Sequence, residues 1–331
     1  MRARQWSVVV AGAVALVACT GSPSNRAARP GSSSASGAPS STTTTVPARP
    51  SEGCGKPPPV AATSEPIGDV SLEFVSGGQT RTYRFGVPPD YDPARPTPLI
   101  LNLHGSGSNA DEQSLYSQLP AKGTRHGDLV VTPNANNANW ELPGQGADDD
   151  FLMGLVDHVA ADYCVDLNRV DAAGISLGSW KATITACTHP DRIAALVLVA
   201  EDVLPKGCAK PVVAFHGTAD PVVPYGPGGD TTVVVTGPNA RLPGAEANMQ
   251  GWATQAGCST DKDIARLEPD VEHWTFRNCP PGREVEFYRI EGGGHTWPGT
   301  PIAVDRLGKT THTIDATDIA LAWFDAHPLR P

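Results

Sequence analysis

The sequence predicts an α/β fold with a mostly parallel central sheet, helices on both faces and an N-terminal β-hairpin. Three observations predict this fold. Short apolar segments, typical of buried parallel strands, alternate with segments of helical spacing. Two segments of alternating polarity, typical of antiparallel strands, come first. In the middle of the chain, residues 174–178 read Gly-Ile-Ser-Leu-Gly where an apolar strand meets a helix, which is the pattern of a sharp strand-to-helix turn.

The separate elements follow from the periodicity of the apolar residues. Residues 70–75 and 81–87 alternate and form the predicted hairpin, whereas the later strands are continuous apolar runs. The acidic residues 148–150 favour the start of a helix. In chain order, the elements after the hairpin are strands at 99–103 and 129–132, a helix at 151–163, a strand at 170–175, a helix at 179–187, strands at 193–200 and 211–216, a helix at 245–256, a strand at 285–290 and a helix at 315–326. Ligands of such a sheet bind beyond the carboxyl ends of its strands.

The length and composition are those of a globular protein. The 331 residues suit one large domain with accessory segments, and 34 Gly and 32 Pro indicate many turns. The formal net charge is −10, and no Lys/Arg cluster rises above the background. These features argue against binding to nucleic acid and against adhesion to anionic membranes through a basic face.

The N-terminus has the features of an export signal. Arg2 and Arg4 precede a short apolar run that ends in Leu-Val-Ala-Cys at residues 16–19, too short for a membrane span. This ending resembles the lipobox of bacterial lipoproteins, in which the cysteine is acylated. We therefore expect a signal peptide at residues 1–18 and a lipid on Cys19. An ordinary cleaved signal with an incidental cysteine is the alternative.

Residues 19–51 consist almost wholly of Ser, Thr, Ala, Gly and Pro. Such a segment buries too little apolar surface to offset its chain entropy, so we expect a disordered tether. The catalytic domain is expected at residues 52–331. Cleavage before Cys19 removes two arginines and no acid, so 23 Lys and Arg against 35 Asp and Glu leave a net charge of −12.

Cysteine usage agrees with export. Setting Cys19 aside, six cysteines remain, at positions 54, 164, 187, 208, 258 and 279. An even count in an exported chain indicates up to three disulfides, with fifteen possible connectivities. No C-x-x-C pair occurs, which argues against a zinc or redox site.

Ser176, in the Gly-Ile-Ser-Leu-Gly turn, is the candidate nucleophile, and His295 is the candidate base. His295 stands in Glu-Gly-Gly-Gly-His-Thr-Trp-Pro-Gly, residues 291–299, after a predicted strand. A loop so rich in glycine buries little surface by itself, so a functional role explains its histidine better than a packing role does. His104 and His216 each end an apolar strand and can be structural. The other six histidines have no comparable setting.

Asp220 is the candidate acid. It lies just past a strand, in the tight turn His-Gly-Thr-Ala-Asp-Pro-Val-Val-Pro at residues 216–224. Glu201 and Asp202 are rivals because they follow the preceding strand, and a plain Asx-turn is the structural alternative for Asp220. We prefer Asp220, since the order Ser176, Asp220, His295 is that of the α/β-hydrolase fold.

These residue types imply nucleophilic catalysis. A serine is a weak nucleophile until a histidine takes its proton, and an aspartate then orients the histidine and stabilises its charged form. The developing oxyanion needs fixed donors, for which we expect the backbone N–H groups of Leu177 and Ser106. This chemistry requires no cofactor and no metal.

Four segments carry a resemblance to a known family. LILNLHGSGSN, YCVDLNRVDAAGISLGS, AFHGTADPVVPY and GGGHTWPG resemble blocks of exported poly(3-hydroxybutyrate) depolymerase-like esterases, a group that includes feruloyl and acetylxylan esterases. The resemblance covers most of the chain from about Tyr83 onward. It implies an α/β-hydrolase fold and a Ser-Asp-His triad at Ser176, Asp220 and His295.

The resemblance also implies that Trp140 and Trp297 line the substrate cleft, with packing as the alternative. In the family the elbow serine is followed by a small or amide residue, whereas this chain has Leu177 and, beyond it, Trp180. We therefore treat Trp180 as a third cleft candidate and expect this departure to affect substrate preference. The chain has no appended substrate-binding domain of the kind that secreted polymer depolymerases carry, so crystalline polymer is disfavoured.

The predicted fold constrains the disulfides. Cys164 precedes the strand of the elbow, and Cys187 lies eleven residues past Ser176, about 16 Å down the next helix, which brings both to the same edge of the sheet. We therefore expect Cys164–Cys187. Cys258 and Cys279 bracket one excursion and are expected to close it, which leaves Cys54–Cys208 by elimination.

We therefore expect an exported, monomeric serine esterase that acts on carboxylic esters and is held at the outer face of the bacterial cytoplasmic membrane by its N-terminal lipid alone. A secreted form is the alternative location. An acyltransferase of the same fold, which passes the acyl group to an envelope sugar, is a second hypothesis. A non-catalytic surface binding protein that has kept the fold is a third.

Overall fold

The computed structural model describes residues 46–63, 68–141, 146–201, 203–227 and 242–330. The predicted signal peptide, Cys19, most of the predicted tether and Asp202 lie outside the described residues. Among the helices of the described part, none is both long enough and apolar enough to cross a membrane.

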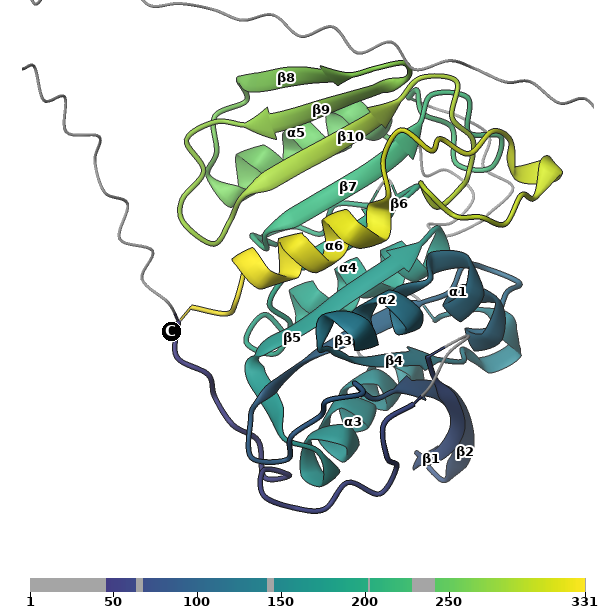
Figure 1. Cartoon of the computed structure of the whole chain (residues 1–331). Coiled ribbons are helices and arrows are strands. Elements are labelled where there is room, and N and C mark those ends of the chain that lie inside the picture. Colours follow the sequence, from purple (N-terminus) through teal and green to yellow (C-terminus); the bar gives the residue numbers. More distant parts are fainter. Residues whose placement is uncertain (1–45, 64–67, 142–145, 202, 228–241, 331) are drawn as a thin grey trace, which may run out of the picture. The chain divides into compact units, whose positions relative to one another are not determined.

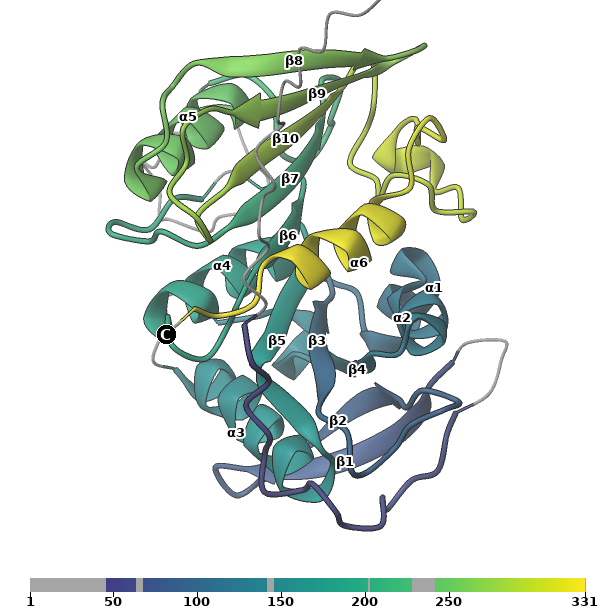
Figure 2. The ribbon, with the colours of Figure 1, turned by 60° about the vertical axis from the view of Figure 1, so that its left-hand side comes forward.

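One sheet forms the centre of the described residues. Its ten strands are β1 (Val70–Ser76), β2 (Gln79–Gly86), β3 (Thr97–Leu103), β4 (Leu129–Pro133), β5 (Val165–Ile175), β6 (Leu196–Val199), β7 (Val212–Gly217), β8 (Lys262–Leu267), β9 (Val271–Phe276) and β10 (Val285–Ile290). They are ordered β1-β2-β4-β3-β5-β6-β7-β10-β9-β8, and Figure 2 shows this series from the β1 edge to the β8 edge. The six strands from β4 to β10 in this order run parallel, with an antiparallel pair at each edge. The α/β-hydrolase type of fold and the N-terminal hairpin are thus confirmed.

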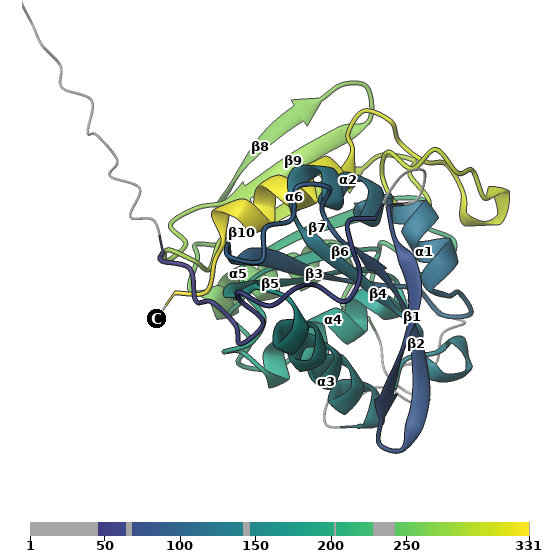
Figure 3. The same ribbon diagram turned by 60° about the horizontal axis from the view of Figure 1, so that its bottom comes forward.

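Helices cover both faces of the sheet. They are α1 (Ala110–Ser117), α2 (Leu119–His126), α3 (Ala147–Asp162), α4 (Leu177–Thr188), α5 (Ala245–Ala256) and α6 (Ala316–Ala326), with short 3₁₀ turns η1 (Asn136–Ala138) and η2 (Asp305–Leu307). Helices α1, α2 and α6 lie on one face and α3, α4 and α5 on the other (Figures 1 and 3).

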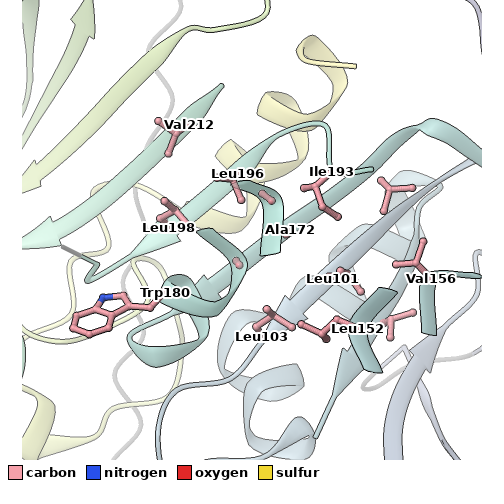
Figure 4. Close-up of a cluster of buried hydrophobic side chains, with 14 of the residues drawn as sticks. Leu101, Leu103, Leu152, Val156, Ala172, Trp180, Ile193, Leu196, Leu198 and Val212 are labelled. Atoms are coloured by element: carbon pink, nitrogen blue, oxygen red, sulfur yellow. The ribbon is translucent and has the colours of Figure 1, made fainter. Parts of the chain in front are cut away.

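The core is divided in two by the sheet, because successive side chains of a strand point to opposite faces. In β3, Leu99, Leu101 and Leu103 pack with α3 and α4, whereas Ile100 packs with α2 and α6. Figure 4 shows part of the first layer, in which Leu101 and Leu103 lie near Leu152 of α3. Burial on both faces explains why the central strands have continuous apolar sequences.

Two parts of the fold were not predicted. Helices α1 and α2 have few apolar residues, and the hairpin of β8 and β9 lies at the sheet edge, where most of β8 is exposed. An exposed edge strand needs no apolar alternation, so its sequence gives no strand signal. In addition, β5 begins at Val165, five residues earlier than predicted.

Two of the three expected disulfides were wrong. The structure joins Cys54 to Cys164 and Cys187 to Cys208, while Cys258 pairs with Cys279 as expected. The backbone N–H groups of Ser51 and Gly53 donate to the carbonyls of Val165 and Ala160, which brings the N-terminal segment against the start of β5.

The expected pairs were wrong because they neglected where each cysteine lies across the sheet, that is, next to which strand. Cys164 and Cys187 both lie toward the N-terminal ends of the parallel strands, as argued from helix length. However, α4 leads on to β6 and β7, so Cys187 meets the segment before β7, which carries Cys208. Both cysteines thus lie at the expected end of the strands. Their disulfide partners are decided by which strands are neighbours in the sheet.

Candidate active site

Ser176 lies between β5 and α4 on a strained turn. Its φ and ψ are 56° and −126°, a combination that L-residues rarely adopt. The two flanking positions require glycine because neighbouring backbone atoms lie too close for a Cβ atom. A Cβ atom on Gly174 would lie 2.5 Å from the carbonyl carbon of Gly178, and one on Gly178 would lie 2.2 Å from the carbonyl oxygen of Leu103. This geometry is that of a nucleophile elbow.

The Gly178→Ala variant is expected to lose at least about 3 kcal/mol of unfolding free energy, because the added methyl group meets rigid backbone. Gly226→Ala is the matched control, since a Cβ atom there has no neighbour within 4 Å. Urea denaturation of both variants checks this. Equal stability of the two would show that the elbow backbone has room to adjust.

His295 and Asp220 form a buried pair. Nδ1 of His295 lies 2.8 Å from Oδ2 of Asp220, whose side chain is fully buried. The other carboxylate oxygen accepts hydrogen bonds from the backbone N–H groups of Val222 (2.7 Å) and Val223 (2.8 Å). The aspartate is therefore fixed by three partners and holds one nitrogen of the imidazole, which leaves Nε2 available on the other side of the ring.

The backbone around His295 is also fixed. The N–H groups of Gly294 and His295 donate to the carbonyls of Lys309 (2.8 Å) and Leu307 (2.7 Å). Asp270 anchors the following segment by accepting from Lys309, Thr311 and Thr313. Sequence analysis missed Asp270, because nothing in a sequence shows that an acid after a distant strand meets this loop.

Glu201 and the two other strand-end histidines have different main partners. Glu201 is buried and accepts from Thr183 Oγ1 (3.0 Å) and the N–H of Val203 (3.2 Å). Nε2 of His216 contacts the Val223 carbonyl oxygen at 2.9 Å and lies 3.5 Å from Oδ2 of Asp220, so this histidine packs against the candidate acid. Nε2 of His104 accepts from the N–H of Ala135, so Nδ1 carries the proton, which it donates to the Gly105 carbonyl. Both histidines are buried structural groups, and burial lowers the pKa of each.

A cleft of about 560 Å³ opens beside the elbow. Ser176 and His295 both line it, although they are not hydrogen-bonded to each other in the described structure; such contacts commonly tighten only in the substrate complex. One wall comes from the end of α1 and another from the loop around η2. The apolar side chains of these walls are Leu115, Tyr116, Ile302, Val304 and Leu307.

The two expected oxyanion donors lie near Ser176. Leu177 is the first residue of α4, where a helix leaves its N–H groups without intrahelical partners. The loop of residues 104–108 runs alongside, since a Cβ atom on Gly105 would lie 3.4 Å from Cβ of Ser176. Neither the N–H of Leu177 nor that of Ser106 has an acceptor among the residues that the structure describes.

The three tryptophans do not line the cleft, contrary to expectation. Trp140, Trp180 and Trp297 are only 4%, 2% and 1% exposed and belong to the two core layers, where their large apolar area is buried. Trp180 is one of the buried side chains drawn in Figure 4. Trp140 still bears on the site, because its Nε1–H donates to the His104 carbonyl (2.9 Å) at the start of the loop that carries Ser106.

A buried ion network lies behind the elbow on α3 and α4. Asp149 contacts the ammonium of the fully buried Lys181 (3.3 Å), and it accepts from Thr185 Oγ1 (2.7 Å) and His189 Nε2 (2.6 Å). Burial alone would raise the pKa of Asp149, but hydrogen bonds from Thr185 and His189, together with the charge of Lys181, lower it. The network fixes α4, whose N-terminus bears Ser176.

The network predicts a pH-dependent stability difference. Because the folded state lowers the pKa of Asp149, the stabilisation is complete above the ordinary carboxyl pKa of about 3.8 and is lost as the pH falls through the lower pKa of the folded state. Asp149→Asn should cost about 3–5 kcal/mol at pH 7, by leaving the Lys181 charge uncompensated, and less at pH 3. Asp150→Asn, exposed on the same helix, is the control. Urea denaturation at both pH values would contradict this if the Asp149→Asn deficit were independent of pH.

Groups of His, Cys, Asp and Glu arranged to hold a metal ion are absent from the described part of the chain.

Comparisons with known proteins agree with this fold. No family model matches the chain. The chain is 29% identical over 290 residues to "Putative esterase NocK" of Nocardia uniformis subsp. tsuyamanensis, covering 77% of this chain and 83% of that protein. It is 27% identical over 285 residues to "Probable feruloyl esterase C" of Aspergillus flavus, covering 81% and 93%. Among solved structures, the acetyl xylan esterase from Aspergillus awamori superposes with a TM-score of 0.53 at 15% identity, covering 77% of this chain and 98% of that one.

The fold and these relatives define the chain as an enzyme of the carboxylic ester hydrolase class, with an α/β-hydrolase type of fold.

Proposed function

We propose that the protein is a serine esterase in which Ser176, His295 and Asp220 form the catalytic triad. One observation carries the proposal: a serine on a strained elbow shares a cleft with a histidine that is held at 2.8 Å by a buried aspartate. Of the rival carboxylates considered from sequence, Asp202 lies outside the described residues. Glu201 is taken up by Thr183 and Val203.

The mechanism follows from these contacts. Ser176 Oγ attacks the ester carbonyl while Nε2 of His295 takes its proton, and the Nδ1–H of His295 stays bonded to Asp220. The backbone N–H groups of Leu177 and Ser106 stabilise the oxyanion. His295 returns its proton to the leaving alcohol. Water then hydrolyses the acyl-enzyme, with His295 acting as base again.

The cleft supports an aromatic or similarly bulky acyl group rather than acetyl. Its volume of about 560 Å³ is that of a ligand pocket, and its lining includes the five apolar side chains named above, together with Ile175 and Val222. A planar phenolic acid would cover this apolar surface, whereas an acetyl group would leave most of it in contact with water. The names of curated relatives, among them feruloyl esterases, agree with this preference.

A panel of methyl ferulate, acetylated xylan oligomers and hydroxybutyrate oligomers tests the substrate. We expect kcat/KM to be at least tenfold higher for methyl ferulate than for the acetyl and hydroxybutyrate esters. Leu115→Ser, on the cleft wall, should reduce that ratio. A preference for hydroxybutyrate oligomers would instead place the chain with the depolymerase-like members of the resembling group, and a preference for acetyl esters would contradict the assignment of the cleft.

We further propose that the protein is exported and carries a lipid on Cys19. Three disulfides within the described residues support an oxidising location. The segment Leu-Val-Ala-Cys at residues 16–19 supports the lipid. Metabolic labelling with a clickable fatty acid should mark the wild-type chain and not Cys19→Ser. Equal labelling of both would exclude this cysteine as the site, and no labelling of either would favour simple secretion.

A further inference from the structure

A second cavity, of about 460 Å³, lies at the end of the sheet opposite the catalytic cleft. It is bounded by the C-terminal end of α4, the segment before β7, the segment before β10 and the residues after α6. In Figure 1 the arrowheads of β5 and β7 point away from this end, where the end marked C lies. The cavity therefore shares no lining residue with the site around Ser176.

The charged residues that line this cavity are all basic. They are Lys210, Arg283 and Arg330, although the whole chain has ten more acidic than basic residues. Neither Arg283 nor Arg330 has a side-chain hydrogen bond or ion pair with any described residue. The side chain of Arg330 lies against the backbone just before Arg283, since a Cβ atom on Gly282 would lie 3.1 Å from Nε of Arg330.

Lys210 is a buried cation without a carboxylate partner. It is 7% exposed, and its ammonium donates to the carbonyls of Pro190 and Ile193, the latter at 2.5 Å. An ammonium has three N–H donors, and the third has no acceptor in the part of the chain that is described. No carboxylate lies within ion-pair distance, although Asp191 and Asp171 act on it from farther away. Burial accordingly lowers the pKa of Lys210 to about 8.

Buried charges in proteins are normally paired, because an uncompensated charge has lost its hydration without a replacement. An anion in the cavity would supply the missing charge. The site is also rigid, since the disulfide Cys187–Cys208 ties the end of α4 to the segment that carries Lys210. Pro190, Pro211, Pro281 and Pro328 also line the cavity.

We propose that this cavity binds a carboxylate-bearing organic ligand about the size of a monosaccharide, with the carboxylate held by Arg283, Arg330 and Lys210. Arginine guanidinium groups bind carboxylates in bidentate geometry, and the buried ammonium adds charge at short range. The volume suits a six-membered ring better than a simple inorganic anion. The proline residues of the lining would contact the body of the ligand.

Calorimetric titration of the disulfide-bonded protein tests the proposal, with D-glucuronate as the probe and D-glucose as its uncharged counterpart. We expect glucuronate to bind with a Kd of about 1 mM or tighter, and glucose not to bind at the same concentrations. The double variant Arg283→Gln/Arg330→Gln changes two exposed residues, so it should fold, and it should bind glucuronate at least tenfold more weakly. Arg266→Gln, on β8, is the matched control and should bind like the wild type.

Equal affinity of the double variant and the wild type, or equal binding of glucose, would overturn the proposal. Binding of inorganic phosphate without binding of glucuronate would also overturn it, because the site would then recognise a small ion only. Lys210→Met should weaken binding further if it folds. Because the experiment measures binding rather than turnover, failure of the ligand proposal would not affect the esterase assignment. Ester hydrolysis by the double variant should equal that of the wild type.

Discussion

Ser176→Ala is expected to lower kcat/KM for ester hydrolysis by about 10⁴–10⁶-fold, because no other group at the elbow can form the acyl-enzyme. The thermal unfolding midpoint should stay within about 2 °C of the wild type, since the substitution removes one oxygen and leaves the strained backbone as it is. Initial rates and thermal denaturation on the same preparation check both statements.

Ser108→Ala is the matched control for that variant. Ser108 lines the same cleft, and its hydroxyl donates to Oε2 of Glu112 at 2.7 Å on the protein surface. Its loss should change kcat/KM by less than about threefold, because surface substitutions away from the reacting atoms have small effects. Turnover by Ser176→Ala within tenfold of the wild type would rule out this serine as the nucleophile.

Asp220→Asn is expected to lower kcat by about 10⁴-fold, the size of effect seen when the aspartate of such a triad becomes an amide. The amide can keep the bonds from Val222 and Val223 through its oxygen. Its NH₂ group then faces Nδ1 of His295 and favours the tautomer with the proton on Nε2, which cannot accept a proton from the serine.

Glu201→Gln tests the rival acid that the structure describes, because the amide oxygen can still accept from Thr183 and Val203. We expect this variant to keep kcat within about threefold of the wild type. A loss in Glu201→Gln as large as that in Asp220→Asn would instead indicate that the acid after β6 takes part in catalysis. The kcat values should be compared at saturating substrate so that binding effects are excluded.

Much of the fold could be predicted because its central strands are buried on both faces and its helices have regular apolar spacing. Residues 99–103 and 211–216, for example, match β3 and β7 closely. The edge hairpin β8–β9 could not be predicted, since Lys262, Asp263 and Arg266 are tolerated where no face is buried. Apolar periodicity arises where one face of an element is buried, so a strand without a buried face gives no such pattern.

The candidate site could be assembled from the sequence because each of its residues follows a strand end, and parallel strands bring those ends together. The surroundings of the site could not be predicted from the sequence. Tryptophan is equally suited to a core and to a cleft, and the burial of Trp140, Trp180 and Trp297 depends on neighbours that are distant in sequence. The pairing of Asp149 with Lys181 is likewise a contact between two helices.

The most direct test of the central claim is covalent labelling with a fluorophosphonate, which reacts with activated serine nucleophiles. After labelling of the folded wild-type protein, peptide mass spectrometry should find one adduct, on Ser176. The variants Asp220→Asn and His295→Ala should label far more slowly under the same conditions. An adduct on a different serine, or none on folded protein that hydrolyses esters, would contradict the account.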